Sequence, residues 1–145
     1  METSLADAIA IPLGFGRAMR VLLVEDDPGQ AKLAHVLVNG GGDGPDLFHI
    51  EWRDNILQAI SGLAKPGIDV VLLDLGMSEL SGYKAHLAII PVTKKTPVVI
   101  FTSDDSAASQ DIPTSQGAFR YLLKNRTSSV ELRQALHEAA WSAPL

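Results

Sequence analysis

Short runs of apolar residues alternate along this chain with stretches in which apolar residues recur every three or four positions. The short runs are typical of strands buried in a parallel sheet, and the wider spacing is typical of helices with one packed face. The expected strands are 21–24, 47–52, 70–73, 98–101 and 119–123. The expected helices are 28–39, 56–64, 82–90, 107–116 and 128–140. This strict alternation predicts an α/β fold with a doubly wound, five-stranded parallel sheet.

The second and fifth strands carry the most polar residues, which places them at the edges of the sheet. Along 47–52, apolar Phe48, Ile50 and Trp52 alternate with polar residues, as in a strand near a sheet edge. Edges at these two strands are consistent with the order 2-1-3-4-5, the flavodoxin-like (βα)5 arrangement. The first and third strands are then neighbours, and ligands of such sheets bind at the carboxyl ends of the strands.

Capping residues and apolar stripes mark the helices. Asp27 and Pro28 suit a helix start, the glycines from Gly40 end that helix, and Ser128 with Glu131 forms a capping box. The apolar stripes expected to face the sheet are Leu33, Ala34 and Leu37, then Ile56, Leu57, Ile60, Leu63 and Ala64, and finally Leu132, Ala135, Leu136, Ala139 and Ala140.

Single polar residues follow the buried strands. Asp74 follows the third strand, and on its own it fits a reactive carboxylate and a turn cap equally well. The other strand-end residues are Glu25 and Asp26 after the first strand, Thr102 after the fourth, and Lys124 after the fifth. Because the carboxyl ends of parallel strands share one edge, we expect these five side chains to meet in one pocket.

Three carboxylates in one pocket repel one another, so they either raise a pKa or bind a hard cation. Oxygen ligands with no histidine nearby in the sequence favour Mg²⁺. Asp74 is then available as a nucleophile toward phosphorus, which would form an aspartyl phosphate. Lys124 would offset charge on the phosphoryl oxygens, and Thr102 would donate a hydrogen bond to one of them.

Composition narrows the class of protein. The 145 residues carry a formal net charge of −5, which argues against nucleic-acid binding, and there are no cysteines for disulfides or thiol chemistry. No apolar run is long enough to cross a membrane, and residues 1–16 lack the basic start of a signal peptide. We expect a cytoplasmic protein with no membrane partner, one domain at 19–145, and a partly disordered extension at 1–18.

Four segments, 21–28, 70–82, 98–105 and 117–124, resemble the receiver domain of bacterial two-component response regulators. The similarity covers roughly 19–141. It implies that a sensor histidine kinase or a phosphotransfer protein passes a phosphoryl group to Asp74, in a signalling domain and not an enzyme. It also implies Mg²⁺ ligation by Asp26, Asp74 and the carbonyl of Gly76, with Glu25 acting through water.

The resemblance further implies a switch. Thr102 and Tyr121 match the pair that couples phosphorylation to a change of surface in this family. The surface expected to change is the fourth helix, fifth strand and fifth helix, roughly 107–140, where a partner or a second copy would bind.

The chain departs from the family pattern at several positions. Family members usually have proline at the position of Ser78 and often at that of Asn125. Gly76 and Asp104 stand where family members control access of water to the phosphoryl group. A haloacid-dehalogenase-like phosphatase would need a second acid where Gly76 stands. The main alternative is a pseudo-receiver, an interaction module that is not phosphorylated.

Overall fold

The computed structural model describes residues 17–40, 47–80, 82–93 and 95–142. Within these ranges the strands are β1 (Met19–Val24), β2 (Phe48–Arg53), β3 (Val70–Leu73), β4 (Val98–Thr102) and β5 (Arg120–Leu123). The helices are α2 (Pro28–Asn39), α3 (Ile56–Leu63), α4 (Lys84–Ile89), the 3₁₀ turn η1 (Ile90–Val92), α5 (Ala107–Ser115) and α6 (Ser129–Ser142). None of these helices is long and apolar enough to cross a bilayer.

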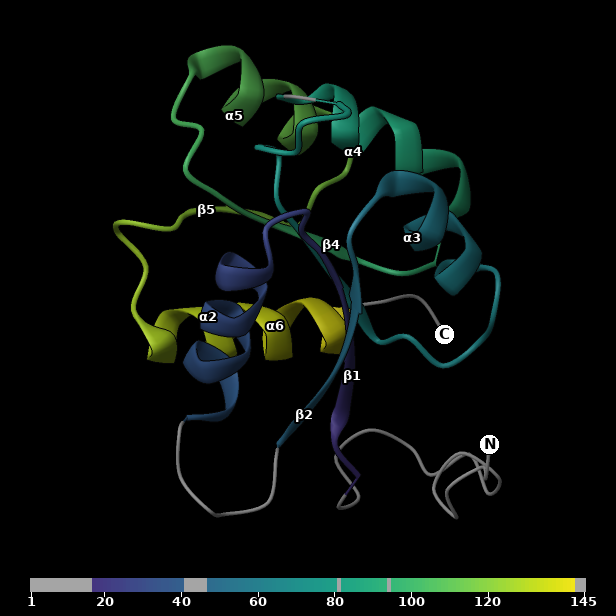
Figure 1. Cartoon of the computed structure of the whole chain (residues 1–145), viewed down its shortest axis with the longest axis vertical. Coiled ribbons are helices and arrows are strands. Elements are labelled where there is room, and N and C mark those ends of the chain that lie inside the picture. The colour runs from purple at the N-terminus through teal and green to yellow at the C-terminus, as the bar shows by residue number, and fades with distance from the viewer. Residues whose placement is uncertain (1–16, 41–46, 81, 94, 143–145) are drawn as a thin grey trace.

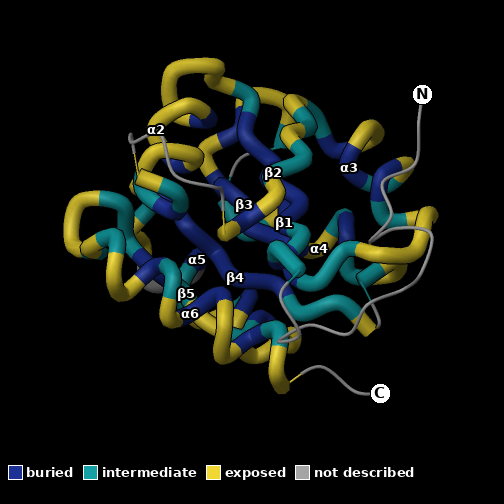
Figure 2. The backbone as a smooth tube through the Cα atoms, turned by 90° about the horizontal axis from the view of Figure 1, so that it is seen from below, coloured by how far each residue is buried: buried dark blue, intermediate teal, exposed yellow. Residues whose placement is uncertain are grey.

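All five strands of the described chain pair in parallel, in the order β2-β1-β3-β4-β5, which confirms the predicted topology. β3 and β4 are buried along their whole length, whereas β2 and β5 each have one buried residue and are otherwise half-buried or exposed. Figure 2 shows the buried central strands surrounded by more exposed elements. The polar residues of β2 and β5 therefore correctly predicted that these strands lie at the two edges of the sheet.

The helix ends follow from their capping residues. The Asp27 carboxylate accepts hydrogen bonds from the N–H groups of the first turn of α2, with Pro28 as its first residue. Gly40 has a φ of +74°, a conformation that glycine adopts without strain, and it ends α2. At the start of α6, the hydroxyl of Ser128 accepts from the N–H of Glu131, as the capping box predicts.

The helices cover both faces of the sheet (Figure 1). α2 and α6 pack on one face, and α3 and α4 pack on the other. The two resulting apolar clusters share the sheet, because successive residues of β1, β3 and β4 point to opposite faces. The core therefore holds the carboxyl ends of the central strands in a fixed arrangement.

Four apolar residues are more exposed than predicted. Leu33 is 49% exposed, Leu57 is 74% exposed and Trp52 is 41% exposed, and Ala64, which follows α3 directly, is exposed as well. In α2 the buried stripe is instead Ala31, Ala34 and Val38. This stripe packs in one apolar cluster with the sheet and α6, and Leu33 lies outside the stripe. In α3 the buried face consists of Ile56, Ala59 and Gly62, and in β2 the edge position leaves the Trp52 ring half covered.

The predicted extension at 1–18 lies almost entirely outside the described residues, and the domain boundary stays a prediction. Arg17 is described, and its guanidinium forms two hydrogen bonds of 2.7 and 2.8 Å with the carboxylate of Asp69. The same carboxylate accepts from the backbone N–H of Arg20 at 2.8 Å. These contacts tie the entry into β1 to the entry into β3.

Candidate functional site

A cavity of about 230 Å³ lies where β1, β3, β4 and β5 end. Its lining residues are Glu25, Asp26, Asp27, Gln30, Asp74, Gly76, Thr102, Ser103, Asp104 and Lys124. All five strand-end residues that the sequence analysis singled out therefore line one cavity. Gly76, the predicted source of a carbonyl ligand, lines it too.

Lys124 bridges the acidic groups of the cavity. Its ammonium lies 2.7 Å from a carboxylate oxygen of Glu25 and 3.4 Å from one of Asp74. It also donates to the side-chain oxygen of Gln30 at 3.1 Å, and it lies 5.8 Å from the centre of the Phe101 ring. Four residues thus surround the Lys124 ammonium, which lies close enough to contact a group bonded to the Asp74 carboxylate.

Glu25 is almost fully buried, with 2% of its surface exposed. Burial raises the pKa of its carboxyl to about 7, the hydrogen bond from Lys124 opposes that rise, and the neighbouring Asp74 adds to it. Its backbone carbonyl accepts from the indole N–H of Trp52 at 2.6 Å. Glu25 is therefore a buried partner of Lys124, with its backbone fixed by the edge strand β2.

Asp26 has a different environment. One oxygen of its carboxylate accepts two hydrogen bonds of 2.8 Å, from the backbone N–H and from the hydroxyl of Ser78. The backbone hydrogen bond from Ser78 is the main reason that the pKa of Asp26 is lowered, and the Ser78 hydroxyl adds to this effect against the cost of burial. Asp26 is therefore an ionised carboxylate tied to the loop that follows β3.

Asp74 follows β3 directly and is 8% exposed. One of its oxygens accepts from the N–H of Gly76 at 2.9 Å, and the other faces Lys124. Its backbone N–H donates to the carbonyl of Val24, which aligns the ends of β3 and β1. The carboxylate is oriented by these contacts and opens onto the cavity.

The donor set of this cavity fits Mg²⁺. Within the described ranges, no three His, Asp or Glu side chains are already placed around one point as a metal cluster. Mg²⁺ does not need such a cage, because it commonly binds one or two carboxylates and keeps several waters. Asp26 and Asp74 line the cavity together with Gly76, while Glu25 is held back by Lys124.

The fourth and fifth strands end in a connected set of hydrogen bonds. The hydroxyl of the fully buried Thr102 accepts from the N–H of Asp104 at 3.3 Å. The phenol of Tyr121 donates to the carbonyl of Asp104. Burial, together with the negative charge of Asp104, raises the pKa of Tyr121 above its usual range, so the phenol stays protonated and remains a donor. Thr102 and Tyr121 thus contact the same short loop.

Four residues in or beside the cavity had no assigned role in the sequence analysis. Ser78 appeared there only as a departure from the family pattern, and Gln30, Ser103 and Glu79 were not singled out. Gln30 reaches Lys124 from the first turn of α2, and the Glu79 carboxylate accepts from the N–H of Ile56 at 2.5 Å. These contacts join segments distant in the chain, so spacing along the sequence carried no signal for them.

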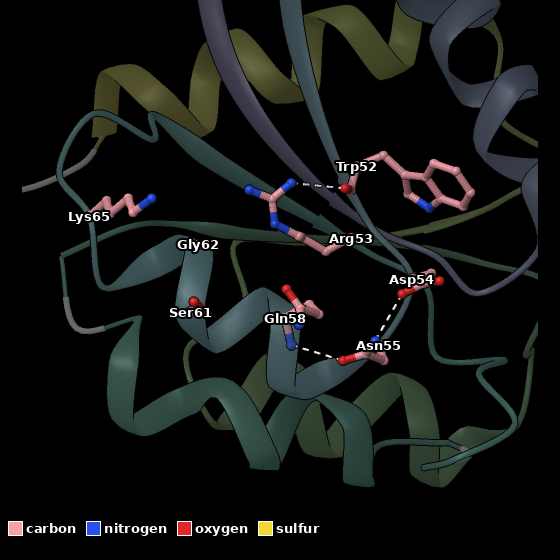
Figure 3. A pocket seen from close by; sticks show the side chains of 8 residues that line it. All are labelled: Trp52, Arg53, Asp54, Asn55, Gln58, Ser61, Gly62 and Lys65. Atoms are coloured by element: carbon pink, nitrogen blue, oxygen red, sulfur yellow. Dashed lines mark hydrogen bonds between the residues drawn. The ribbon is translucent and has the colours of Figure 1, made fainter. Parts of the chain in front are cut away.

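A larger cavity of about 570 Å³ lies between the end of β2 and helix α3 (Figure 3). It is lined by Trp52, Arg53, Asp54, Asn55, Gln58, Ser61, Gly62 and Lys65. The guanidinium of Arg53 donates to the carbonyl of Trp52 at 3.0 Å and lies 3.8 Å from the Glu51 carboxylate. None of the strand-end residues lines it, so the smaller cavity, where the acidic groups and Lys124 converge, is the candidate site.

Comparison with known proteins gives a consistent result. The family model described as response regulator receiver domain matches residues 21–137. The signal transduction histidine-protein kinase BarA of Shigella flexneri is 29% identical over 110 residues, which are 74% of this chain and 11% of the kinase. The two-component response regulator ORR41 of Oryza sativa subsp. japonica is 30% identical over 70% of this chain and 80% of its own length. The chain thus spans about a tenth of the kinase and most of the plant regulator.

Solved structures share the fold. A response regulator receiver domain protein from Clostridium thermocellum superimposes with a TM-score of 0.70 at 22% identity, over 84% of this chain and 94% of that one. The response regulator domain of CheB from Thermotoga maritima gives a TM-score of 0.71 at 22% identity, over 88% of this chain and all of that one.

Proposed function

Because this chain belongs to the response regulator receiver domain family, we propose that it accepts a phosphoryl group on Asp74 from a sensor histidine kinase or a phosphotransfer protein. The observation that carries the proposal is the position of Asp74. Its carboxylate stands at the end of the central strand β3, opens onto the cavity, and has one oxygen 3.4 Å from the ammonium of Lys124.

The proposed transfer is a displacement at phosphorus. An oxygen of Asp74 bonds to the phosphorus while the P–N bond of a donor phosphohistidine breaks, and the bonding electron pair stays on the imidazole. Lys124 offsets the negative charge on the phosphoryl oxygens, and its contacts with Glu25 and Gln30 hold it in place for this role. The Thr102 hydroxyl accepts from the N–H of Asp104, so its own proton can be donated to a phosphoryl oxygen.

The proposed metal site uses Asp26, Asp74 and the carbonyl of Gly76 as direct ligands, with Glu25 acting through water. When bound, Mg²⁺ supplies positive charge that offsets the phosphoryl oxygens and the repulsion between the carboxylates. The protein's part is to hold Asp26 in one orientation through Ser78 and to keep the Asp74 carboxylate facing the cavity.

The proposed output is a change of surface. Thr102 and Tyr121 would couple phosphorylation of Asp74 to α5, β5 and α6, roughly residues 107–140, where an output partner or a second copy of the chain would bind. In this role the domain is a cytoplasmic signalling module that is itself modified, and not an enzyme.

The decisive experiment is phosphorylation by a small phosphodonor. With acetyl phosphate and Mg²⁺, the protein should gain one phosphoryl group by intact mass, and Asp74→Asn should gain none. Asp111→Asn, which alters an exposed carboxylate on α5, is the matched control and should gain one as the wild type does. A group that persists in Asp74→Asn, or that maps to Asp26 or Asp27, contradicts the assignment. A wild type that gains none, either from the phosphodonor or from phosphorylated kinase, favours the pseudo-receiver.

A further inference from the structure

We propose that Ser78 is a positioning residue for the metal site, which orients the Asp26 carboxylate and fastens it to the loop that carries Gly76. The inference rests on the proposed function, because it concerns how the same cavity binds Mg²⁺. It goes beyond that function by giving a role to a residue at which this chain departs from the family pattern.

The contacts of Ser78 are specific to one oxygen. Both its N–H and its hydroxyl donate to Oδ2 of Asp26, each at 2.8 Å. The two donors occupy the lone pairs of that oxygen, and neither of them uses Oδ1. A single carboxylate oxygen is what Mg²⁺ takes from one aspartate in its octahedral shell. Ser78 thus holds Asp26 ready to bind through one defined oxygen.

Carboxylates that bind metals are themselves commonly hydrogen-bonded, and the outer partners fix their orientation. Without Ser78, the Asp26 side chain would rotate about its side-chain torsions, and binding would have to restrict that freedom. In the structure the two hydrogen bonds from Ser78 supply this restriction. We therefore expect the two hydrogen bonds from Ser78 to raise the affinity for Mg²⁺.

Ser78 also joins two segments that are 52 residues apart in the chain. Asp26 belongs to the turn between β1 and α2, whereas Gly76 and Ser78 belong to the loop after β3. The next residue of this loop, Glu79, accepts from the N–H of Ile56 at the start of α3. The loop is thus held on two sides, which fixes the backbone of Gly76 relative to Asp26.

Proline at this position could not make either contact, since it has neither an N–H nor a hydroxyl. In this chain the two hydrogen bonds from Ser78 hold the loop at the position where family members usually have proline. The hydroxyl and the backbone N–H can be removed separately, which makes the inference testable.

The experiment measures the Mg²⁺ dissociation constant of the whole chain by calorimetry and by Trp52 fluorescence. The indole of Trp52 donates to the carbonyl of Glu25, so its emission reports on the residue beside Asp26. Ser78→Ala removes the hydroxyl, and the constant should rise about tenfold. Ser78→Pro removes both donors, and the rise should be larger, up to about 100-fold. Ser78→Thr keeps both donors and should restore affinity to near the wild-type value.

Two controls isolate the contact with Asp26. Ser61→Ala changes an exposed serine on α3 outside the site and should leave the constant unchanged. In an Asp26→Ala background, Ser78→Ala should have no further effect. Far-UV circular dichroism checks folding, and if Ser78→Pro is unfolded the decision rests on Ser78→Ala, which keeps the backbone N–H.

The outcomes separate this inference from the proposed function. Unchanged or tighter Mg²⁺ binding in folded Ser78→Ala, with Asp74 still phosphorylated, overturns the role of Ser78 alone. An additional loss from Ser78→Ala in the Asp26→Ala background also overturns it. A wild type that binds no Mg²⁺ overturns both the inference and the proposed metal site.

Discussion

Glu25 and Asp26 are consecutive acidic residues, yet their carboxylates have opposite properties. Burial raises the pKa of Glu25 to about 7, whereas hydrogen bonds from Ser78 lower the pKa of Asp26. The cause is the neighbourhood of each side chain and not the residue type. The Glu25 carboxylate accepts a hydrogen bond from Lys124, and the Asp26 carboxylate accepts from Ser78 in the loop after β3. The pair thus divides into a buried partner for Lys124 and an ionised carboxylate held by the loop after β3.

His86 is a buried titratable group outside the site. It is 2% exposed on α4, and its Nδ1 is buried without a hydrogen-bond partner among the described residues. Burial lowers the pKa of this imidazole below its ordinary value of 6.5. The folded protein therefore resists protonation of His86 at a pH where the unfolded chain accepts the proton.

This difference predicts a pH dependence of stability. As the pH falls below about 6.5, the unfolded chain binds a proton at His86 first, so this group alone lowers the free energy of unfolding by up to about 1.4 kcal/mol per pH unit until the folded protein is protonated too, while Glu25, whose pKa is raised, contributes with the opposite sign. His86→Leu should reduce this slope in urea unfolding measured between pH 5 and about 7.5. His49→Gln, a change at an exposed histidine, should keep it. An unchanged slope in His86→Leu would show that other groups cause it.

The ends of β4 and β5 are linked through one loop, which suits them to transmit a change. Asp104 donates its N–H to the Thr102 hydroxyl and accepts the Tyr121 hydroxyl at its carbonyl. A phosphoryl group on Asp74 would attract the Thr102 hydroxyl, which would weaken the first contact and free the loop to shift. Tyr121 would move with the loop, because its phenol is hydrogen-bonded to the carbonyl of Asp104.

We expect Thr102→Ala to separate phosphorylation from its output. Asp74 should still gain a phosphoryl group, since its carboxylate and Lys124 are unchanged, but amide chemical shifts of residues 107–140 should no longer respond to it. Thr102→Ser keeps the hydroxyl and should respond, and Thr93→Ala is a control for loss of a distant hydroxyl. Shifts in Thr102→Ala that respond as in the wild type would mean that the signal takes another route.

The two apolar clusters on either side of the sheet make the described part of the chain one cooperative unit. Leu132 of α6 belongs to one cluster and Ile89 of α4 to the other, and both are fully buried. The strands between them contribute side chains to both clusters. Loss of packing on one face should therefore weaken the other.

Leu132→Ala and Ile89→Ala should each lower the free energy of unfolding by about 2–5 kcal/mol. In each variant, Trp52 fluorescence and far-UV circular dichroism should give the same unfolding midpoint, because a single domain of this size unfolds in one step. Trp141→Phe removes the second, exposed indole and leaves Trp52 as the reporter. Two separate midpoints in Ile89→Ala would show that the faces unfold independently.

Strand order and the strand-end residues could be predicted because they depend on local pattern and on general rules of parallel sheets. The runs at 70–73 and 98–101 are apolar throughout since both faces of a central strand are covered, and the strand at 47–52 alternates because an edge strand is partly open. Parallel strands end at one edge, so Asp74, Thr102 and Lys124 had to lie near one another. Caps such as Asp27 act within one turn of helix and were equally visible.

Contacts between distant segments could not be predicted in this way. Which carboxylate Lys124 approaches most closely, Glu25 at 2.7 Å or Asp74 at 3.4 Å, depends on how β5 and β1 are placed around β3. The outward position of Leu33 depends on which side of α2 packs against the sheet and α6. The hydrogen bonds from Ser78 to Asp26 form because the turn after β1 and the loop after β3 meet at the carboxyl ends of these strands. Such contacts follow from the packing of whole elements, and periodicity along the chain carries no information about them.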